Sequence, residues 1–365
     1  MAEALVLVGT RKGLIIARSD AGRRSWDVDP MHFANQEVSA VAIDTRRDTP
    51  RILAGISWGH WGTSVAYSDD LGHTWQEPDH APIAFPESTG AALARVWQLH
   101  PAPAGQPDVV YAGVEPHALF RSEDGGLSFS LVQGLWDHPH RTQWRPGGGG
   151  ACLHTVVTHP EDPQWLMAVM SAGGAYRSLD GGATWNPANR GISQPGAPED
   201  QRFPEFGQCV HKVAMHPSRP SRLFAQNHFG VYRSEDAGAS WVAIEDGLPS
   251  NFGFPIVVHP EHPDMLFNFP LEADMNRIPP SGRCRVYRST DAGGSWQALS
   301  VGLPSETYYA AVLRDAMTTD GGAPAGLYFG TRLGEVYGSL DCGDSWSAVA
   351  TRLPDVLSVR AAVLP

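Results

Sequence analysis

YRSLDGGATW occupies residues 176–185, and this stretch decides the fold. Within it, Ser178, Asp180, Gly182 and Trp185 form the pattern S-x-D-x-G-x-x-W. The pattern recurs, with Phe in place of Trp in the third copy and one extra residue before the Trp in the first, degenerate copy. The aspartates of the seven copies are Asp20, Asp70, Asp124, Asp180, Asp236, Asp291 and Asp341. Copies at intervals of 50–56 residues indicate a repeat architecture in which each repeat is one supersecondary unit.

The chemistry of this stretch is that of a hairpin turn. Ser and Asp side chains hydrogen-bond to nearby backbone groups, and Gly adopts positive φ without strain. Residues before the turn, such as Val231 and Tyr232, alternate as in a β-strand. The Trp after the turn is expected to pack on the sheet of its own unit. Seven equivalent catalytic aspartates would be strange, so we interpret these residues as structural.

The repeated turn resembles the Asp box, or bacterial neuraminidase (BNR) repeat, of the sialidase-like superfamily. This motif occurs in sialidases, other glycoside hydrolases, sortilin-type receptors and a photosystem assembly factor. The resemblance implies that each turn joins the third and fourth strands of a propeller blade, on the face away from the active site. It covers nearly the whole chain and is specific for the architecture. It is not specific for an activity, because function resides in sites and not in folds.

The remaining features fit an all-β, seven-bladed β-propeller of four-stranded blades that spans residues 1–365 as one domain. The first unit lacks its innermost strand, since ALVLVGT already reads as a second strand. The tail LSVRAAVLP at 357–365 reads as the missing strand. We therefore expect the C-terminal strand to join the N-terminal blade and close the ring, which leaves few exposed sheet edges. In the seventh unit, YAAVLRD from Tyr309 is the predicted innermost strand.

Composition narrows the class of protein. The 365 residues carry a net charge of −12, which argues against nucleic acid or an anionic membrane as partner. The sequence contains no apolar run of about 20 residues, the length of a membrane span. Four cysteines form no disulfide framework, and the N-terminus has no basic leader. We expect a cytoplasmic protein that binds a small-molecule or carbohydrate ligand. The oligomeric state is left open.

Histidines fall into two groups. His100, His159, His216 and His259 each precede Pro at the end of an innermost strand and are interpreted as turn residues. His154 and His211 instead begin adjacent innermost strands. Counting back from the His-Pro turn places Arg95, His154, His211 and Phe254 at matching positions around the mouth of the central channel, on the face opposite the repeated turns. The turns between second and third strands rise on that face and bring His228 close to them.

The first functional hypothesis is a glycoside-hydrolase-like enzyme acting on a small polar or carbohydrate-like substrate. Such enzymes use two carboxyl groups, or a Tyr nucleophile in sialidases. The candidate catalytic residues are Glu115, Glu272, Asp274 and Tyr308, the last with Glu306 as its base. The candidate substrate-binding residues on the same face are Arg11, Trp58, Trp61, Arg95, Arg277 and Arg332. The sialidase Arg-Ile-Pro motif is not in its usual place, because Arg277-Ile278-Pro279 lies late, inside the sixth unit.

Two alternatives stay open. Imidazoles on neighbouring strands can converge on one ion, so His154, His211 and His228 are candidate ligands of a divalent metal ion, with Cys152 and Cys209 nearby. The other alternative is a non-catalytic binding or assembly module, as in some proteins with this repeat. The Gly run 147–150 lacks the Lys and Ser/Thr of a phosphate-binding P-loop and is expected to be a flexible loop.

Overall fold

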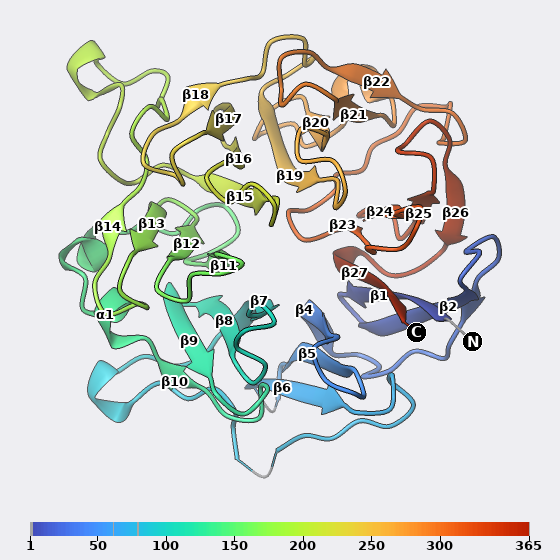
Figure 1. The fold of residues 1–365 in the computed structure, drawn as a ribbon, viewed down its shortest axis with the longest axis horizontal. Helices are drawn as coiled ribbons and strands as arrows, with labels where there is room; N and C mark the ends of the chain where they lie inside the picture. The colour runs from blue at the N-terminus through green and yellow to red at the C-terminus, as the bar shows by residue number, and fades with distance from the viewer. Residues whose placement is uncertain (1–2, 61, 79, 365) are drawn as a thin grey trace.

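A computed structural model describes residues 3–60, 62–78 and 80–364 of the chain. The strands form seven sheets arranged in a ring (Figure 1), and within each sheet neighbouring strands are antiparallel. The predicted seven-bladed β-propeller is therefore confirmed. Neighbouring blades pack through their innermost strands, so the hydrophobic core is distributed between the blades. In the part of the chain described, no helix is long and apolar enough to cross a membrane.

Each blade runs from the centre of the ring to its rim. The innermost strands are β27 (Val356–Leu364), β4 (Glu37–Asp44), β7 (Arg95–Pro101), β11 (Leu153–Thr158), β15 (Val210–Met215), β19 (Phe252–Val258) and β23 (Met317–Thr319). The second strands are β1 (Glu3–Thr10), β5 (Arg51–Trp58), β8 (Val110–Glu115), β12 (Leu166–Met170), β16 (Leu223–Asn227), β20 (Leu266–Leu271) and β24 (Leu327–Gly330).

The outer half of each blade carries the repeated turn. The third strands are β2 (Gly13–Asp20), β6 (Gly62–Ser68), β9 (Ala118–Ser122), β13 (Gly174–Ser178), β17 (Gly230–Ser234), β21 (Val286–Ser289) and β25 (Val336–Ser339). The fourth strands are β3 (Asp27–Val28), β10 (Ser130–Leu131), β14 (Asn186–Pro187), β18 (Val242–Ala243), β22 (Gln297–Leu299) and β26 (Ser347–Ala350). In the second blade the fourth position is taken by an isolated bridge between Tyr67 and Gln76.

Short helical segments lie only in connections among the described residues. They are α1 (Gln133–Trp136) and the 3-10 turns Glu87–Thr89, Pro139–Gln143, Glu199–Gln201 and Pro280–Gly282.

The C-terminal strand closes the ring as predicted. β27 pairs with β1 in antiparallel register from Thr10 opposite Val356 to Glu3 opposite Leu364. The two ends of the chain therefore lie in the same blade (Figure 1). This pairing satisfies the edge of β1, which would otherwise offer free backbone groups to another chain.

The prediction for the innermost strand of the seventh blade is wrong about where this strand begins. Residues 309–313 are in no ladder, and β23 begins only at Met317. The backbone turns first, with Ala316 N donating to Leu313 O at 3.0 Å. The residues of the expected strand are nevertheless buried, for example Val312. Burial of an apolar run does not require a regular ladder, which is why the pattern misled the prediction.

The repeated turn is held by its own side chains. In the fourth blade, Ser178 Oγ donates to Asp180 Oδ1 at 2.8 Å and accepts from Gly182 N at 2.8 Å. Asp180 also accepts from the backbone and side chain of Thr184, at 2.9 and 2.6 Å. Trp185 is buried. Both oxygens of the aspartate carboxylate thus accept hydrogen bonds within the turn. The turn lies on the face opposite the turns that join second and third strands.

Each repeated turn also docks on the preceding blade. Gly238 has φ +81°, and a Cβ there would lie 2.4 Å from Met167 Cε of the fourth blade. Arg177 of that blade donates to Ala237 O at 2.9 Å. The same arginine-to-carbonyl contact recurs from Arg233 to Ala292 and from Arg288 to Cys342. The arginine of the Y-R-S segment therefore joins neighbouring blades, a role that the sequence analysis did not assign.

Candidate functional site

The mouth, meaning the end of the ring away from the repeated turns, is shaped by bulges in the innermost strands. The ladders skip one residue in β4, β7, β11 and β15, namely Ser39, Trp97, His154 and His211. A bulge leaves the extra residue unpaired and re-aims its side chain. Trp97, and not Arg95, is therefore the residue of β7 that corresponds to His154 in β11 and His211 in β15. The predicted match at Arg95 is wrong because the distance between the bulge and the His-Pro turn differs between blades.

The two bulge histidines have different surroundings. His211 Nδ1 lies 2.6 Å from Gly253 O on the next innermost strand, so this nitrogen carries the hydrogen and Nε2 keeps its lone pair. His154 Nδ1 lies 3.2 Å from Thr155 Oγ1, and its Nε2 is buried with no hydrogen-bond partner in the described part of the chain. Burial lowers the pKa of both rings well below the usual value, so both are neutral.

Three of the four His-Pro histidines are turn residues, as predicted. His100 is not, because it lies within β7 opposite Tyr111 and its Nε2 is 2.9 Å from Thr158 Oγ1. The Nδ1 atom of His159 accepts from the backbone of Glu161 and Asp162 at 3.2 and 3.0 Å. His216 and His259 accept in the same way from backbone groups two residues on. Their recurrence therefore reflects turn geometry.

A glycine loop, residues 147–150, lies over the mouth. Gly147 and Gly150 exchange two backbone hydrogen bonds of 3.0 Å. Gly150 has φ +113°, and a Cβ at this residue would lie 2.3 Å from Glu115 Oε1. Glu115 itself accepts from Trp97 Nε1 at 3.0 Å and from Ala151 N at 3.3 Å. The predicted catalytic residue Glu115 therefore anchors the glycine loop to the ring.

Two pockets adjoin beneath this loop. The histidine pocket has a volume of about 210 Å³ and is lined by residues that include Ser171, Ser193, Gln194, Gln208, Cys209, Asn227, His228, Phe254, Asp274, Arg277 and Arg314. The arginine pocket has a volume of about 240 Å³ and is lined by residues that include Arg11, Glu37, Ser39, Arg95, Trp97, Arg314, Asp315 and Arg332. Gly148, Gly149 and Arg314 line both, so Arg314 lies at the junction.

Most arginines of the mouth are neutralised by acids. Arg95 pairs with Glu37 at 2.8 Å. Arg11 and Arg332 share Asp355, at 3.0 and 2.7 Å. These three predicted ligand-binding arginines do line the arginine pocket, but each already has a carboxylate partner.

Arg314 is the exception. Its guanidinium lies 5.3 Å from the ring centre of Trp97 and 5.6 Å from that of Phe254. Its Nε is buried without a hydrogen-bond partner, and within the described residues Arg314 forms no ion pair. The sequence analysis missed this residue because it placed Arg314 inside a regular strand. The signal that could have identified it is its position, near the end of the segment predicted as the innermost strand of the seventh blade.

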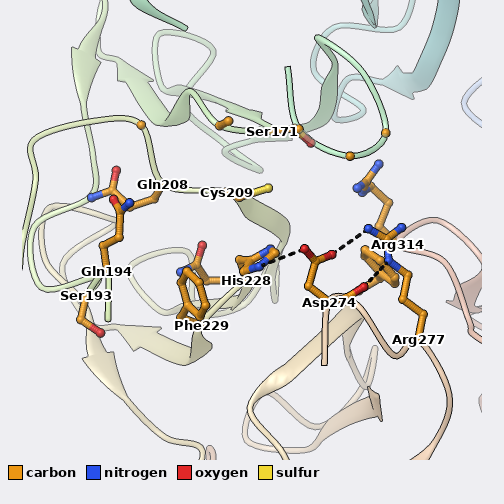
Figure 2. A pocket seen from close by; sticks show the side chains of 17 residues that line it. Ser171, Ser193, Gln194, Gln208, Cys209, His228, Phe229, Asp274, Arg277 and Arg314 are labelled. Carbon is orange, nitrogen blue, oxygen red and sulfur yellow. Dashed lines mark hydrogen bonds and ion pairs between the residues drawn. The ribbon is translucent and has the colours of Figure 1, made fainter. Parts of the chain in front are cut away.

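Asp274 is the predicted acid that does reach a pocket. Its Oδ2 lies 3.8 Å from His228 Nε2 and its Oδ1 lies 2.8 Å from Arg277 Nη2. Figure 2 shows Asp274 between His228 and the arginines, in the wall of the histidine pocket. Arg277 also lies over the Phe254 ring, at 5.4 Å.

The other predicted catalytic residues lie elsewhere. Glu272 accepts from Asn276 Nδ2 and, at 3.3 Å, from Ser281 N, within its own loop. Tyr308 is buried and donates to Glu335 Oε2 at 2.5 Å, so its carboxylate neighbour is Glu335 and not the predicted Glu306. In the described part of the chain, neither residue lines the two pockets.

Trp58, one of the two predicted tryptophans, does not add to the pockets described above. Trp58 is exposed at the end of β5 and lines neither pocket, and its ring centre lies 6.4 Å from that of His60. Trp61 lies outside the described residues.

The predicted metal-ligand set is only partly assembled. The donor atoms of Cys209, His211 and His228 lie within 4.8 Å of one another. His154 is not a member of this cluster, because its bulge lies one blade earlier. Cys209, named in the sequence only as a neighbour, takes its place. Burial raises the pKa of the Cys209 thiol and lowers that of His228.

Comparison with known proteins supports the fold. No protein-family model matches the chain. A xyloglucanase from Hypocrea jecorina (strain QM6a) is 24% identical over 360 residues, which cover 82% of this chain and 38% of the xyloglucanase. The solved GH74 xyloglucanase from Xanthomonas campestris has a TM-score of 0.65 and 18% identity, covering 95% of this chain and 52% of that chain. YCF48 bound to D1 peptide has a TM-score of 0.52 and 13% identity, covering 85% and 81%.

The chain therefore spans about half or less of the length of the xyloglucanases that it matches. At these identities the likeness to solved structures shows the propeller fold. The chain is a propeller similar to those of glycoside hydrolases.

Proposed function

We propose that this propeller is a glycoside-hydrolase-like protein that binds a small anionic carbohydrate at the mouth, beneath the glycine loop. Arg314 holds the anionic group of the ligand, and the polar wall of the histidine pocket holds its hydroxyl groups. Asp274 is the acid or base for turnover. Binding by Arg314 is the part that the geometry supports best.

The observation that carries this proposal is the unpaired charge of Arg314. A guanidinium that is partly withdrawn from water is costly without an anionic partner. Arg314 has two aromatic neighbours and no carboxylate partner among the described residues, whereas its neighbours Arg95 and Arg277 are both paired. A bound carboxylate, sulfate or phosphate would complete the pairing, and guanidinium binds such groups in two-point contacts.

The wall of the histidine pocket supports a polyhydroxylated ligand. Among the described residues, Gln208 Oε1 and Asn227 Oδ1 are buried without a hydrogen-bond partner, and both residues line the pocket. Buried acceptors are stabilised by donors such as sugar hydroxyls. The xyloglucanase likeness is a second, independent reason to propose a carbohydrate.

Asp274 is proposed as the catalytic carboxylate. Glycoside hydrolysis in most families needs an acid and a second carboxyl group. Asp274 is held by Arg277 and faces His228, which is the environment of an oriented carboxylate. The arginine pocket offers a second carboxylate, Glu37, since its other acid, Asp315, is held by Lys212 and Arg360. A ligand that spans the junction would lie between Asp274 and Glu37.

Ligand binding tests the proposal directly. Isothermal titration would compare acidic sugars, such as a uronic acid and a sugar phosphate, with their neutral counterparts. We expect the wild type to prefer an acidic sugar. Arg314→Met should weaken that binding about tenfold or more, since a hydrogen bond to a charged group contributes roughly 1.5–3 kcal/mol. Affinity for neutral sugars should not change.

Arg141→Met is the matched control, because Arg141 also lies over a tryptophan, 3.9 Å from the ring centre of Trp136, but lines neither pocket. Equal losses in the two variants would overturn the assignment of Arg314, as would equal affinity for acidic and neutral sugars. For turnover, Asp274→Asn should abolish release of the aglycone from an aryl glycoside of the preferred sugar while binding remains. Unchanged release would remove Asp274 from the proposal.

A further inference from the structure

Three side chains of the kinds that bind metals lie together at the histidine pocket, and they come from two backbone segments of the fifth blade. Cys209 ends the long connection before β15, His211 is the bulge residue of β15, and His228 is in the turn between β16 and β17. A backbone hydrogen bond of 2.9 Å from His228 N to Cys209 O joins the two segments. The donor atoms of the three side chains lie within 4.8 Å of one another.

His211 makes a backbone contact that is typical of metal-bound histidines. Its Nδ1–H donates to Gly253 O at 2.6 Å, which leaves the lone pair of Nε2 available. Metal-bound histidines usually donate their other ring N–H to a carbonyl or carboxylate in this way. His211 is only 2% exposed, so the ring is fixed by its surroundings. The ring centres of His211 and His228 are 5.5 Å apart.

The pocket leaves room for a fourth ligand. Cys209 and His228 both line the open histidine pocket, so an ion can enter from solvent. Asp274 Oδ2 lies 3.8 Å from His228 Nε2, on the same wall. One thiolate and two imidazoles are the donor types that favour Zn²⁺, and three protein ligands with an open fourth position are typical of catalytic zinc sites.

We propose that Cys209, His211 and His228 bind one Zn²⁺ ion in the histidine pocket, with a water molecule or Asp274 in the fourth position. This inference goes beyond the proposed sugar binding and does not depend on it.

A second cluster in the described residues provides an internal comparison. His259, Glu261 and His262 also have donor atoms within 4.8 Å of one another. There, however, His259 Nδ1 accepts from Glu261 N at 3.1 Å, which is the turn contact seen in other blades. Glu261 and His262 are exposed on that turn. This cluster is explained by turn geometry, so it serves as the control.

The test is a Co²⁺ titration of chelator-treated, full-length protein. Co²⁺ is a spectroscopic substitute for Zn²⁺, and a cysteine ligand gives a thiolate-to-Co²⁺ charge-transfer absorption. We expect saturation at one equivalent, tetrahedral d–d bands, the charge-transfer absorption, and loss of all three on adding Zn²⁺. Cys209→Ser should abolish the charge-transfer absorption, and His228→Ala should weaken Co²⁺ binding at least tenfold.

Two control variants should leave the spectrum unchanged. Cys152→Ser alters another buried thiol, whose Sγ contacts Ser171 Oγ at 3.1 Å, and His262→Ala alters the comparison cluster. Far-ultraviolet circular dichroism checks that each variant is folded, and His228→Ala is the safer ligand variant because His228 lies in a turn. The proposal is overturned if the wild type binds no Co²⁺, or if its spectrum survives both Cys209→Ser and His228→Ala. Sugar titrations in chelator-containing buffer report on the proposed function separately.

Discussion

Asp315 is the residue whose replacement should destabilise the ring most clearly. Its side chain is 5% exposed, and its Oδ1 accepts from Lys212 Nζ at 2.5 Å and from Arg360 Nη2 at 3.0 Å. Lys212 is in β15, Arg360 is in the closing strand β27, and Asp315 directly precedes the last innermost segment. One carboxylate thus joins the fifth blade, the seventh blade and the ring closure.

Asp315→Asn keeps the shape of the side chain and removes its charge. Removing one partner of a buried ion pair costs about 3–5 kcal/mol, because the remaining charge is left unpaired. The pKa gives a second estimate. The Lys212 and Arg360 charges, acting against the opposing effect of burial, lower the pKa of Asp315 to about 2 from an ordinary value of 3.8. At about 1.36 kcal/mol per pKa unit, this shift stabilises the fold by roughly 2.5 kcal/mol.

Urea unfolding at neutral pH, followed by tryptophan fluorescence, would measure the loss in the free energy of unfolding. Because the folded pKa of Asp315 is lowered, its stabilisation is full above about pH 4 and is lost as the pH falls towards about 2. The difference between wild type and variant should therefore shrink over this range. Asp108→Asn is the matched control. It removes an exposed ion pair with Arg47 and should cost less than about 1 kcal/mol.

A loss below about 1 kcal/mol for Asp315→Asn at pH 7 would refute the reasoning. So would a loss that stays constant between pH 4 and pH 2, because the effect would then not come from the charge.

Three further outcomes are expected. A chain that ends at residue 355 lacks β27 and exposes the edge of β1, so size-exclusion chromatography and circular dichroism should show aggregated or unfolded protein; a stable monomer would refute the closure. Asp236→Ala removes three hydrogen bonds of a repeated turn and should lower the free energy of unfolding by about 1–2 kcal/mol with ligand binding unchanged; loss of binding alone would contradict a structural role. Gly150→Ala places a Cβ 2.3 Å from Glu115 Oε1, so it should displace the glycine loop and weaken ligand binding at the mouth; unaltered affinity would separate the loop from the site.

The sequence was sufficient for the architecture because the information is local and repeated. Each turn needs Ser, Asp and Gly within five positions, and the side chains that satisfy the turn come from the same segment. Seven copies of the turn predict seven blades. The first unit lacks an innermost strand and the C-terminal tail reads as a strand, and together these two features predict how the ring closes. The innermost strand of the seventh blade was misplaced because an apolar run can be buried without entering a ladder.

The candidate site was only partly predictable. His211, His228, Asp274 and Arg277 were named from their places in the repeat. The structure places the last three in the lining of one pocket, and His211 beside His228. Glu272 and Tyr308 were chosen by the same reasoning, but their side chains find partners elsewhere. A position in the repeat predicts which end of the ring a residue lies at, and it does not predict where the side chain points. The predicted cytoplasmic location stays a prediction.

What the sequence alone determined is therefore the ring: the number of its blades, the turns that build them and the strand that closes it. Only the tertiary structure decided which residues meet at the mouth. One-residue bulges re-aim the side chains of the innermost strands. Trp97, and not Arg95, therefore occupies the bulge position that the histidines occupy in their own blades. Arg314 is left without an ion-pair partner among the described residues, between aromatic rings of other blades. Cys209 meets two histidines of its own blade because the turn between β16 and β17 folds back beside β15. Such contacts depend on distances between segments far apart in the chain, which a local pattern does not encode.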